Sequence, residues 1–310
     1  MTHWQPTASI NTLRQRADAL KQVRAFFQQR QVMEVDTPAL MPHTVTDPYM
    51  TALSVDVLQQ KMYLQTSPEY AMKRLLAAGS GDIYQLAKNY RADEQGRKHQ
   101  PEFTLLEWYR LGWDHHQLMD EVYELVSEIT GITKRTNITY QQAFIDHLSL
   151  DPTAITDEVL SERAEQLLGE LPNNMLREDY LSLLFAEKIE PIIAEQRITF
   201  VYDFPASQSS LARLLSDKTV AGRFECYCNG LELANGFWEL TDAKEQMQRF
   251  QHDQTVRQTL DRPSVDIDQA FIAALEHGLP DCSGVALGFD RLLMLALNKS
   301  DIRDVLPFAR

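Results

Sequence analysis

Hydrophobic residues recur at helical spacing in the first part of the chain, at Leu13, Ala17, Leu20, Val23 and Phe27. This spacing predicts an amphipathic helix over about residues 7–30, with one apolar face turned to the core. The next segment, VMEVDTPALMP, is β-prone but contains two prolines, which predicts a short, interrupted strand. The chain is therefore expected to begin with a helix and a strand that ends at a proline.

Segments rich in β-branched and aromatic residues predict the strands that would make up most of a sheet. They lie at residues 52–58, 61–65, 82–91, 102–113, 198–204, 223–228 and 231–240. Between the second and third of these, Ser67-Pro68-Glu69 predicts the start of a helix that runs to about Ala78, with serine as N-cap and proline in the first turn. The segment GVALGFDRLLMLALN, near the C-terminus, predicts a buried strand, a glycine and then a helix.

Helical and acidic patterns dominate residues 115–131 and about 139–196, where Pro152, Pro172 and Pro191 divide the chain into short pieces. We interpret residues 149–197 as a helical insertion within a single domain that spans residues 1–310. Two further helices are predicted at residues 242–260 and 268–277. Because successive strands follow one another without crossover helices, we expect a mainly antiparallel sheet and an α+β fold.

Composition is that of an ordinary globular protein, with 44% hydrophobic and 24% charged residues in 310. No apolar run is long enough to span a bilayer, and MTHWQPTASI at the start has no signal-peptide pattern. Cys226, Cys228 and Cys282 form neither a disulfide framework nor a four-ligand zinc set, and we expect Cys226 and Cys228 to be reduced packing residues on one strand face. These features favour a cytoplasmic protein with no membrane partner.

Net charge is −14, from 44 acidic and 30 basic residues. A protein that grips nucleic acid needs clustered lysine and arginine to neutralise phosphates, and no basic stripe is visible along the chain. The balance therefore weighs against tRNA as the main partner, although a local basic groove is compatible with it.

The first candidate for chemistry is the polar loop between the strands at 82–91 and 102–113, within YRADEQGRKHQPEFTLLEWYR. A hairpin there would present Arg91 from one strand beside Phe103 on the other. The planar guanidinium suits phosphate or carboxylate, because it donates two parallel hydrogen bonds. An exposed charged hairpin without a binding role is the alternative.

Two acids stand in an apolar strand, Glu232 and Glu239 in GLELANGFWEL. Their separation of seven is odd, so a regular strand would place them on opposite faces. A bulge at Asn235-Gly236 would bring both to one face, where a cation or metal would compensate the cost of burying them. The alternative is a solvated strand face.

The third candidate is GVALGFDRLLMLAL, in which Gly284 and Gly288 would allow close backbone approach and Arg291 opens an otherwise apolar helix. A structural ion pair between Arg291 and Asp290 is the alternative to a binding role.

Three segments in chain order resemble motifs 1, 2 and 3 of the class II aminoacyl-tRNA synthetases. They are the first helix with the strand that ends at Pro38, the hairpin carrying Arg91, and the glycine-rich strand followed by Arg291. TSPE at residues 66–69, HQPEFTLLEWY at 99–109 and ELANGFWEL at 232–240 resemble the lysyl branch. The resemblance implies an antiparallel sheet of six or seven strands flanked by helices, and a homodimer formed through motif 1.

Motif 1 begins at once in this sequence, with no room for the N-terminal anticodon-binding barrel of lysyl-tRNA synthetases. The chain thus resembles the shortened paralogues that attach (R)-β-lysine to a lysine of elongation factor P. The implied reaction forms an aminoacyl-adenylate from ATP and lysine or β-lysine, and then transfers it to the ε-amine of that acceptor lysine. The preferred lysine isomer stays open.

The resemblance also implies residue roles at the nucleotide. The two catalytic arginines are Arg91, which would neutralise the α-phosphate, and Arg291, which with His99 would hold the terminal phosphates. Phe103 would stack on adenine and Glu232 would help to hold Mg²⁺. The ATP would also be lined by Ala92, Asp93, Gln100, Leu233 and Gly288.

The implied amino-acid pocket consists of Ser67, Pro68, Glu69, Tyr109, Glu239 and Ala286. Glu69 would pair with the amino group near the carboxylate, and Glu239 with Tyr109 would take the distal ammonium. A dicationic substrate needs carboxylates at both ends, and the sequence supplies them.

The sequence departs from the family pattern at three places. Ala92-Asp93 replaces an asparagine and a glutamate, which leaves Glu94 as a possible substitute for the acid. Gln100 replaces an asparagine, and Ala286 replaces a glycine that bears on substrate choice. Two other functions fit the same motifs: a truncated lysyl-tRNA synthetase, and a non-catalytic paralogue that regulates a partner. The second commonly loses the phosphate-binding arginines, which are present here.

Overall fold

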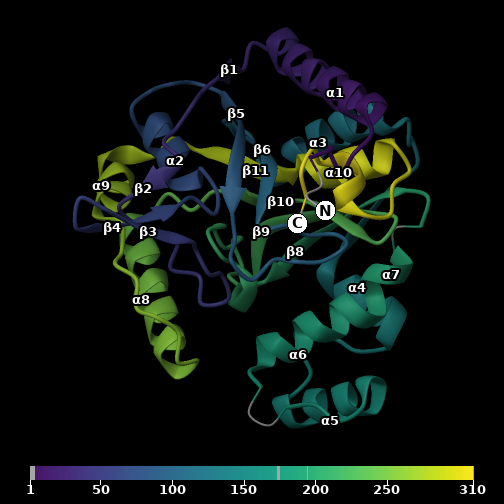
Figure 1. Ribbon diagram of the computed structural model, residues 1–310. Coiled ribbons are helices and arrows are strands. Elements are labelled where there is room, and N and C mark those ends of the chain that lie inside the picture. The colour runs from purple at the N-terminus through teal and green to yellow at the C-terminus, as the bar shows by residue number, and fades with distance from the viewer. Residues whose placement is uncertain (1–3, 173–174, 194, 310) are drawn as a thin grey trace.

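The computed structural model describes residues 4–172, 175–193 and 195–309. Its centre is an eight-stranded sheet (Figure 1). In spatial order the strands are β1 (Met33–Glu34), β5 (Ile83–Tyr90), β6 (Glu102–Leu111), β11 (Cys282–Gly288), β10 (Leu231–Trp238), β9 (Val220–Cys228), β8 (Ile198–Pro205) and β7 (Arg135–Thr139).

The six central strands pair antiparallel, and β1 and β7 join the two edges in parallel. The predicted α+β class with a mainly antiparallel sheet is confirmed. The strand number exceeds the expected six or seven because two short parallel strands extend the edges. The β7 segment, RTNIT, is β-branched but so short that it was not predicted between its helical neighbours.

One face of the sheet packs against α1 (Ile10–Gln29), α3 (His115–Thr130) and α10 (Phe289–Ala296). Alternate residues of the strands, among them Leu106, Trp108, Phe224 and Val285, point into this core because side chains alternate along a strand. Cys226 and Cys228 are unpaired and buried, as expected, and so is Cys282.

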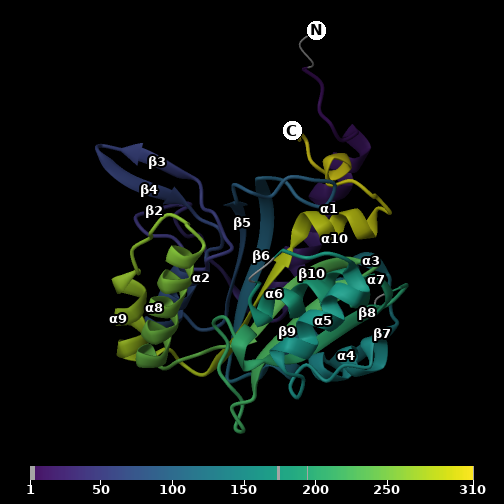
Figure 2. The same cartoon turned by 90° about the horizontal axis from the view of Figure 1, so that it is seen from below.

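Two groups of helices flank the other face. At one end lie α2 (Glu69–Ala77), α8 (Ala243–Thr259) and α9 (Gln269–Gly278). At the other lie α4 (Tyr140–Leu148), α5 (Asp157–Leu168), α6 (Arg177–Leu184), a π-helical turn (Phe185–Ile189) and α7 (Glu190–Ile193). Both views show these groups on opposite sides of the molecule (Figure 2).

The helices of the predicted insertion share a core with the sheet, because Leu181 and Leu184 cluster with Val201 and Tyr227 of the strands. The division of the chain into one domain with an insertion at 149–197 stays a prediction.

A small three-stranded sheet, ordered β2 (Leu40–Met41), β4 (Gln60–Leu64) and β3 (Ser54–Val57), lies beside α8 and α9. The other elements of the described residues are the 3-10 turns Ala206–Gln208 and Ile302–Val305.

The N-cap of α2 differs from the prediction. Pro68 occupies the cap position, and Ser67 stands one residue earlier. Ser67 Oγ still accepts a hydrogen bond from the Glu69 amide at 3.1 Å. Within the described ranges, no helix combines the length and apolar character needed to cross a membrane.

Candidate functional site

Strand register gathers most of the predicted site residues on the face between the two helix groups. Residues directly opposite in antiparallel strands point to the same face. Glu107 lies opposite Ala286, which lies opposite Asn235. Tyr109 lies opposite Gly284 in the neighbouring row. Ala286 is therefore part of the same surface as the two polar residues of β6.

A β-bulge places Glu232 and Glu239 on the same face of the sheet. The register of β10 against β9 shifts between Glu232 and Ala234, so the bulge is at Leu233 and not at Asn235-Gly236 as predicted. The extra residue moves Glu232 to the face of Asn235 and hence of Glu239. The two acids do not meet, however. Glu232 lies near Arg291, and Glu239 lies at the helix group of α2.

Arg91 follows β5 and lies over the ring of Phe103, with its guanidinium carbon 5.1 Å from the ring centroid. Its Nη1 pairs with Glu94 at 2.9 Å, and Asp93 instead lies 3.7 Å from Arg262. The buried Nε of Arg91 has no hydrogen-bond partner in the part of the chain that the structure describes. A guanidinium with a free, buried donor suits an anionic ligand.

Arg291 projects from α10 toward the β5–β6 loop. It donates to the Glu232 carbonyl at 2.8 Å and to the Lys98 carbonyl at 3.3 Å, and it contacts His99. Burial and the adjacent guanidinium lower the pKa of His99, so its ring is neutral at pH 7.

The alternative of an Arg291–Asp290 ion pair is wrong. Asp290 pairs with Arg16 at 2.6 Å and accepts from the Thr104 amide. Arg291 thus stays directed at the face that carries the other site residues.

Glu225 was missed by the sequence analysis. It lies opposite Asn235 in the sheet and acts as a like charge on Glu232. Partial burial and the charge of Glu225 raise the pKa of Glu232. Solvent weakens this effect, because the Glu232 side chain is 39% exposed. Glu232 lies 3.9 Å from Arg291, whereas Glu225 is already paired with Arg223 and accepts a hydrogen bond from the Tyr227 hydroxyl. Carboxylate oxygens are ligands that Mg²⁺ takes together with phosphate oxygens, so Glu232 fits the expected ion and Glu225 lies close to it.

At the other end of the face, Lys73 of α2 lies between two acids. Its ammonium is 2.6 Å from Glu69 and 2.6 Å from Glu239, and its side chain is 1% exposed. Glu69 and Glu239 were assigned to opposite ends of the substrate, but here one ammonium contacts both. Lys73 escaped sequence analysis, although its position four residues after Glu69 on a helix is the spacing of an ion pair.

Glu107 completes this cluster. It accepts hydrogen bonds from Ser67 Oγ at 2.8 Å and from the Tyr109 hydroxyl at 2.7 Å. We define Glu69, Lys73, Glu107 and Glu239 as the carboxylate cluster. Glu107 was also missed; its signal was its place two residues before Tyr109, on the same strand face.

Burial sets the protonation of the carboxylate cluster. It raises the pKa of Glu239 to about 8 against the opposing charge of Lys73. Burial and the negative charge of Glu69 raise the pKa of Glu107 to about 7. Burial alone would lower the pKa of Lys73, but Glu239 and Glu69 outweigh it and raise this pKa. Lys73 therefore stays protonated, and its single positive charge cannot neutralise all three glutamates of the cluster.

Two glycines of β11 have different surroundings. A β-carbon on Gly284 would overlap the Tyr109 ring and approach Glu239 Oε1, so only glycine fits there. A β-carbon on Gly288 would meet only Arg291 atoms, at 3.6 Å or more. Close approach within the chain is thus confirmed at Gly284 but not at Gly288.

The remaining predicted residues occupy varied positions. The Ala92 amide donates to the Thr51 carbonyl at 2.9 Å and is not free for a nucleotide. Gln100 is buried, and the Leu233 side chain points into the core behind the sheet. The structure thus brings Arg91, Phe103, His99, Glu232 and Arg291 to one end of the face and Ser67, Glu69, Tyr109 and Glu239 to the other.

Comparison with known proteins identifies relatives along the whole chain. The family model for class II tRNA synthetases (D, K and N) matches residues 2–310. A Hamiltonella defensa protein named elongation factor P–(R)-β-lysine ligase is 48% identical over 315 residues, covering 99% of this chain and 97% of the relative. Proteins of that name from Edwardsiella ictaluri and Pseudoalteromonas translucida are each 49% identical, and cover 100% and 98% of this chain and 98% and 97% of themselves.

Proposed function

Because this chain belongs to the class II tRNA synthetase family, whose members use ATP, we propose that it activates (R)-β-lysine or lysine with ATP and transfers it to a lysine of elongation factor P. The names of its relatives, which match over nearly their full length, support the acceptor and the β-lysine substrate.

The observation that carries the proposal is the charge balance of the carboxylate cluster. The cluster holds three acids but only one lysine, which contacts Glu69 and Glu239, and the pKa values of Glu107 and Glu239 are raised in the absence of further positive charge. Lysine and β-lysine each bring two ammonium groups, so a bound substrate supplies the missing charge. A monoamine substrate would leave one buried acid without a cation, which is costly.

Positions within the cluster suggest how the substrate is oriented. Lys73 contacts one oxygen each of Glu69 and Glu239, so their other oxygens remain for the substrate. We propose that Glu69 with Glu107 takes the amino group near the carboxylate, and that Glu239 with Tyr109 takes the distal ammonium. Ser67 and Pro68 hold the start of α2 beside this pocket.

The first step joins the substrate carboxylate to the α-phosphorus of ATP and releases pyrophosphate. Arg91 would neutralise the α-phosphate as its charge redistributes, and Phe103 would stack on adenine beside it. Arg291 and neutral His99 would hold the terminal phosphates. The strand face would hold both ligands in line, so that positioning would supply much of the rate enhancement.

In the second step, the neutral ε-amine of the acceptor lysine attacks the adenylate carbonyl. The new amide C–N bond forms, the bond from carbonyl carbon to phosphate oxygen breaks, and AMP leaves as the nitrogen loses its proton. Glu232 would hold Mg²⁺, with Glu225 close by and paired with Arg223, and the bound ion would neutralise charge on the phosphates.

ATP–pyrophosphate exchange tests the activation step. We expect exchange with (R)-β-lysine or α-lysine, and none with norleucine, which lacks the distal ammonium. A folded protein that exchanges pyrophosphate with no lysine isomer would favour the regulatory paralogue and refute this proposal.

Intact-mass analysis tests the acceptor. Unmodified elongation factor P should gain one lysyl mass at a single lysine, and its Lys→Arg variant should gain none. Efficient charging of tRNA with no mass shift on the factor would favour a truncated lysyl-tRNA synthetase.

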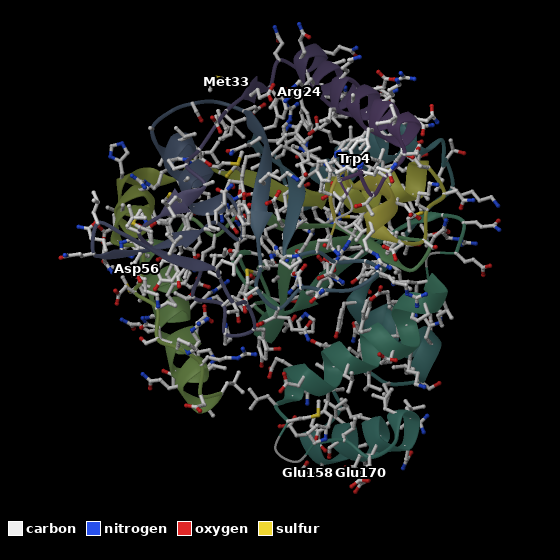
Figure 3. The ribbon with its side chains drawn as sticks, viewed as in Figure 1. Trp4, Arg24, Met33, Asp56, Glu158 and Glu170 are labelled. Carbon is white, nitrogen blue, oxygen red and sulfur yellow. The ribbon has the colours of Figure 1, made fainter. Side chains whose placement is uncertain are left out.

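We also propose a cytoplasmic homodimer. Met33 in β1 is 48% exposed and Ile10 in α1 is 57% exposed, which leaves apolar surface along the motif 1 segment. Met33 and Arg24 lie at this outer edge (Figure 3). Light scattering after size exclusion should give a dimer mass, and Met33→Glu should shift it toward the monomer.

A further inference from the structure

Two neighbouring histidines and an aspartate from distant parts of the chain meet beside the start of α3. His115 and His116 open this helix, and Asp203 lies in β8. One donor atom from each lies within 4.8 Å of the other two. None of the three is among the residues proposed for ATP or lysine.

The His115 ring is oriented so that its Nε2 faces Asp203 and its Nδ1 faces the protein interior. Its Nε2 lies 3.1 Å from Asp203 Oδ1, and the side chain is 3% exposed. Its Nδ1 lies close to Gly222 and has no hydrogen-bond partner within the described ranges. A ligand can therefore reach this ring only through Nε2, on the side of Asp203.

Asp203 reaches His115 through an irregular backbone. Its φ of 57° is in the left-handed region, which non-glycine residues adopt rarely. The register of β8 against β9 shifts at the same place, between Tyr202 and Phe204. A bulge of this kind re-aims a side chain, and here the carboxylate is directed to the imidazole.

His116 supplies a third donor that solvent can reach. Its ring lies 4.1 Å from that of His115 and edge-on to Tyr202. Burial and the neighbouring His115 lower the pKa of His116. Asp114 and Asp120 add negative charge to these surroundings.

We propose that His115, His116 and Asp203 form a site for a divalent transition metal ion, with zinc as the expected ion and the fourth position open to solvent. Imidazole and carboxylate donors suit zinc among the divalent ions. Zinc bonds of about 2.0–2.2 Å place tetrahedral donors roughly 3.3 Å apart. The His115–Asp203 separation of 3.1 Å already matches that spacing. Rotation of the exposed His116 ring completes the set.

The bound ion would join the first turn of α3 to the irregular part of β8, two segments 88 residues apart in sequence. The site therefore predicts a zinc-dependent rise in the midpoint of thermal unfolding, because zinc binds the folded chain and finds no such site in the unfolded one.

Calorimetric titration of the untagged, chelator-treated chain with zinc chloride tests the proposal. We expect one equivalent to bind, and cobalt to give the visible bands of a tetrahedral complex. His116→Gln and Asp203→Asn should each weaken binding by at least roughly 10-fold, since even loss of an outer-shell partner commonly costs that much. Asparagine tolerates the left-handed backbone, and His116 is exposed, so both variants are expected to fold.

His147→Gln, which changes an exposed histidine on α4, is the matched control and should bind zinc like the wild type. Glu232→Gln should also retain the site, which separates it from the proposed Mg²⁺ position. If the wild type binds no zinc, or if His116→Gln binds it as tightly as His147→Gln does, the proposal is overturned. If Asp203→Asn fails to fold, the comparison of the two histidine variants decides alone.

Discussion

The ammonium of Lys73 lies 2.6 Å from a carboxylate oxygen of Glu239, and both side chains are only 1% exposed. A lysine of the protein thus occupies the place beside Glu239 where a substrate ammonium was expected. Because the ion pair is buried, its two members depend on each other strongly.

Lys73→Met should therefore damage the fold as well as the pocket. Removing one partner of a buried pair leaves an uncompensated charge and costs about 3–5 kcal/mol. We expect the free energy of unfolding in urea to fall by that order at pH 9, above the pKa of about 8 of Glu239, where the pair is ionised. Lys73→Met combined with Glu239→Gln should recover part of the loss, since no unpaired acid then remains at position 239. Equal stability of the single and double variants would contradict this coupling.

The raised pKa values predict a pH dependence without substrate. Glu107 and Glu239, at about 7 and about 8, hold protons in the folded chain that their unfolded forms, near 4.5, have released. The folded state therefore binds more protons in this window, and the free energy of unfolding should fall as pH rises from about 5 to 8. Each group contributes at most about 1.4 kcal/mol per pH unit.

Urea titrations at several pH values check this slope, and Glu239→Gln should flatten it. The KM for lysine should fall over the same interval, because the deprotonated carboxylates bind ammonium better. A slope that is identical in wild type and Glu239→Gln would place the titration elsewhere.

Arg291→Ala and Arg91→Ala should abolish pyrophosphate exchange without unfolding the chain. Each loses charge-assisted contacts worth about 1.5–3 kcal/mol, and more in the transition state. Arg303→Ala is the control, because this exposed arginine pairs only locally with Asp301. Loss of Arg291 should also raise the pKa of His99 in NMR titration, since a nearby positive charge is removed. Near-normal exchange by folded Arg91→Ala would end the assignment of that residue.

Gly284→Ala and Gly288→Ala form a matched pair on β11. At position 284 the new methyl overlaps Tyr109 and Glu239, and overpacking of this kind costs about 1–3 kcal/mol. At position 288 it meets only ordinary contacts, and φ is −70°. Thermal unfolding should be lowered only by the first change, which should also raise the KM for lysine. Equal midpoints for the two variants would contradict the packing argument.

Ala286→Gly should change the preference between lysine isomers. Ala286 lies opposite Glu107, at the proposed amino end of the substrate. Its methyl would crowd an amino group on the carbon next to the carboxylate more than one a carbon further along. Binding pockets discriminate between substrates that differ by one methylene group by about 1–3 kcal/mol, or roughly 10–200-fold in kcat/KM. The kcat/KM for α-lysine should therefore rise relative to that for β-lysine, and an unchanged ratio would mean that Ala286 only fills volume.

Local patterns in the sequence were sufficient for the fold class and for part of the site. The hairpin that carries Arg91 and Phe103 was predicted correctly because its two strands are neighbours in the chain, so that register alone brings the residues together. The need for a bulge between Glu232 and Glu239 followed from their odd spacing. Its position at Leu233 did not, because pairing with β9 selects where the extra residue is accommodated.

Tertiary packing alone decided the rest. Lys73 has the sequence context of a solvated helix residue, and only the packing of α2 against α9 and the sheet buries it between Glu69 and Glu239. His115 and Asp203 lie 88 residues apart, and a backbone irregularity in β8 directs one toward the other. The sequence by itself determined which residues can carry charge on each strand face, because alternation is local. Which charges share a site depended on long-range contacts, since burial and partner choice arise only when distant elements pack.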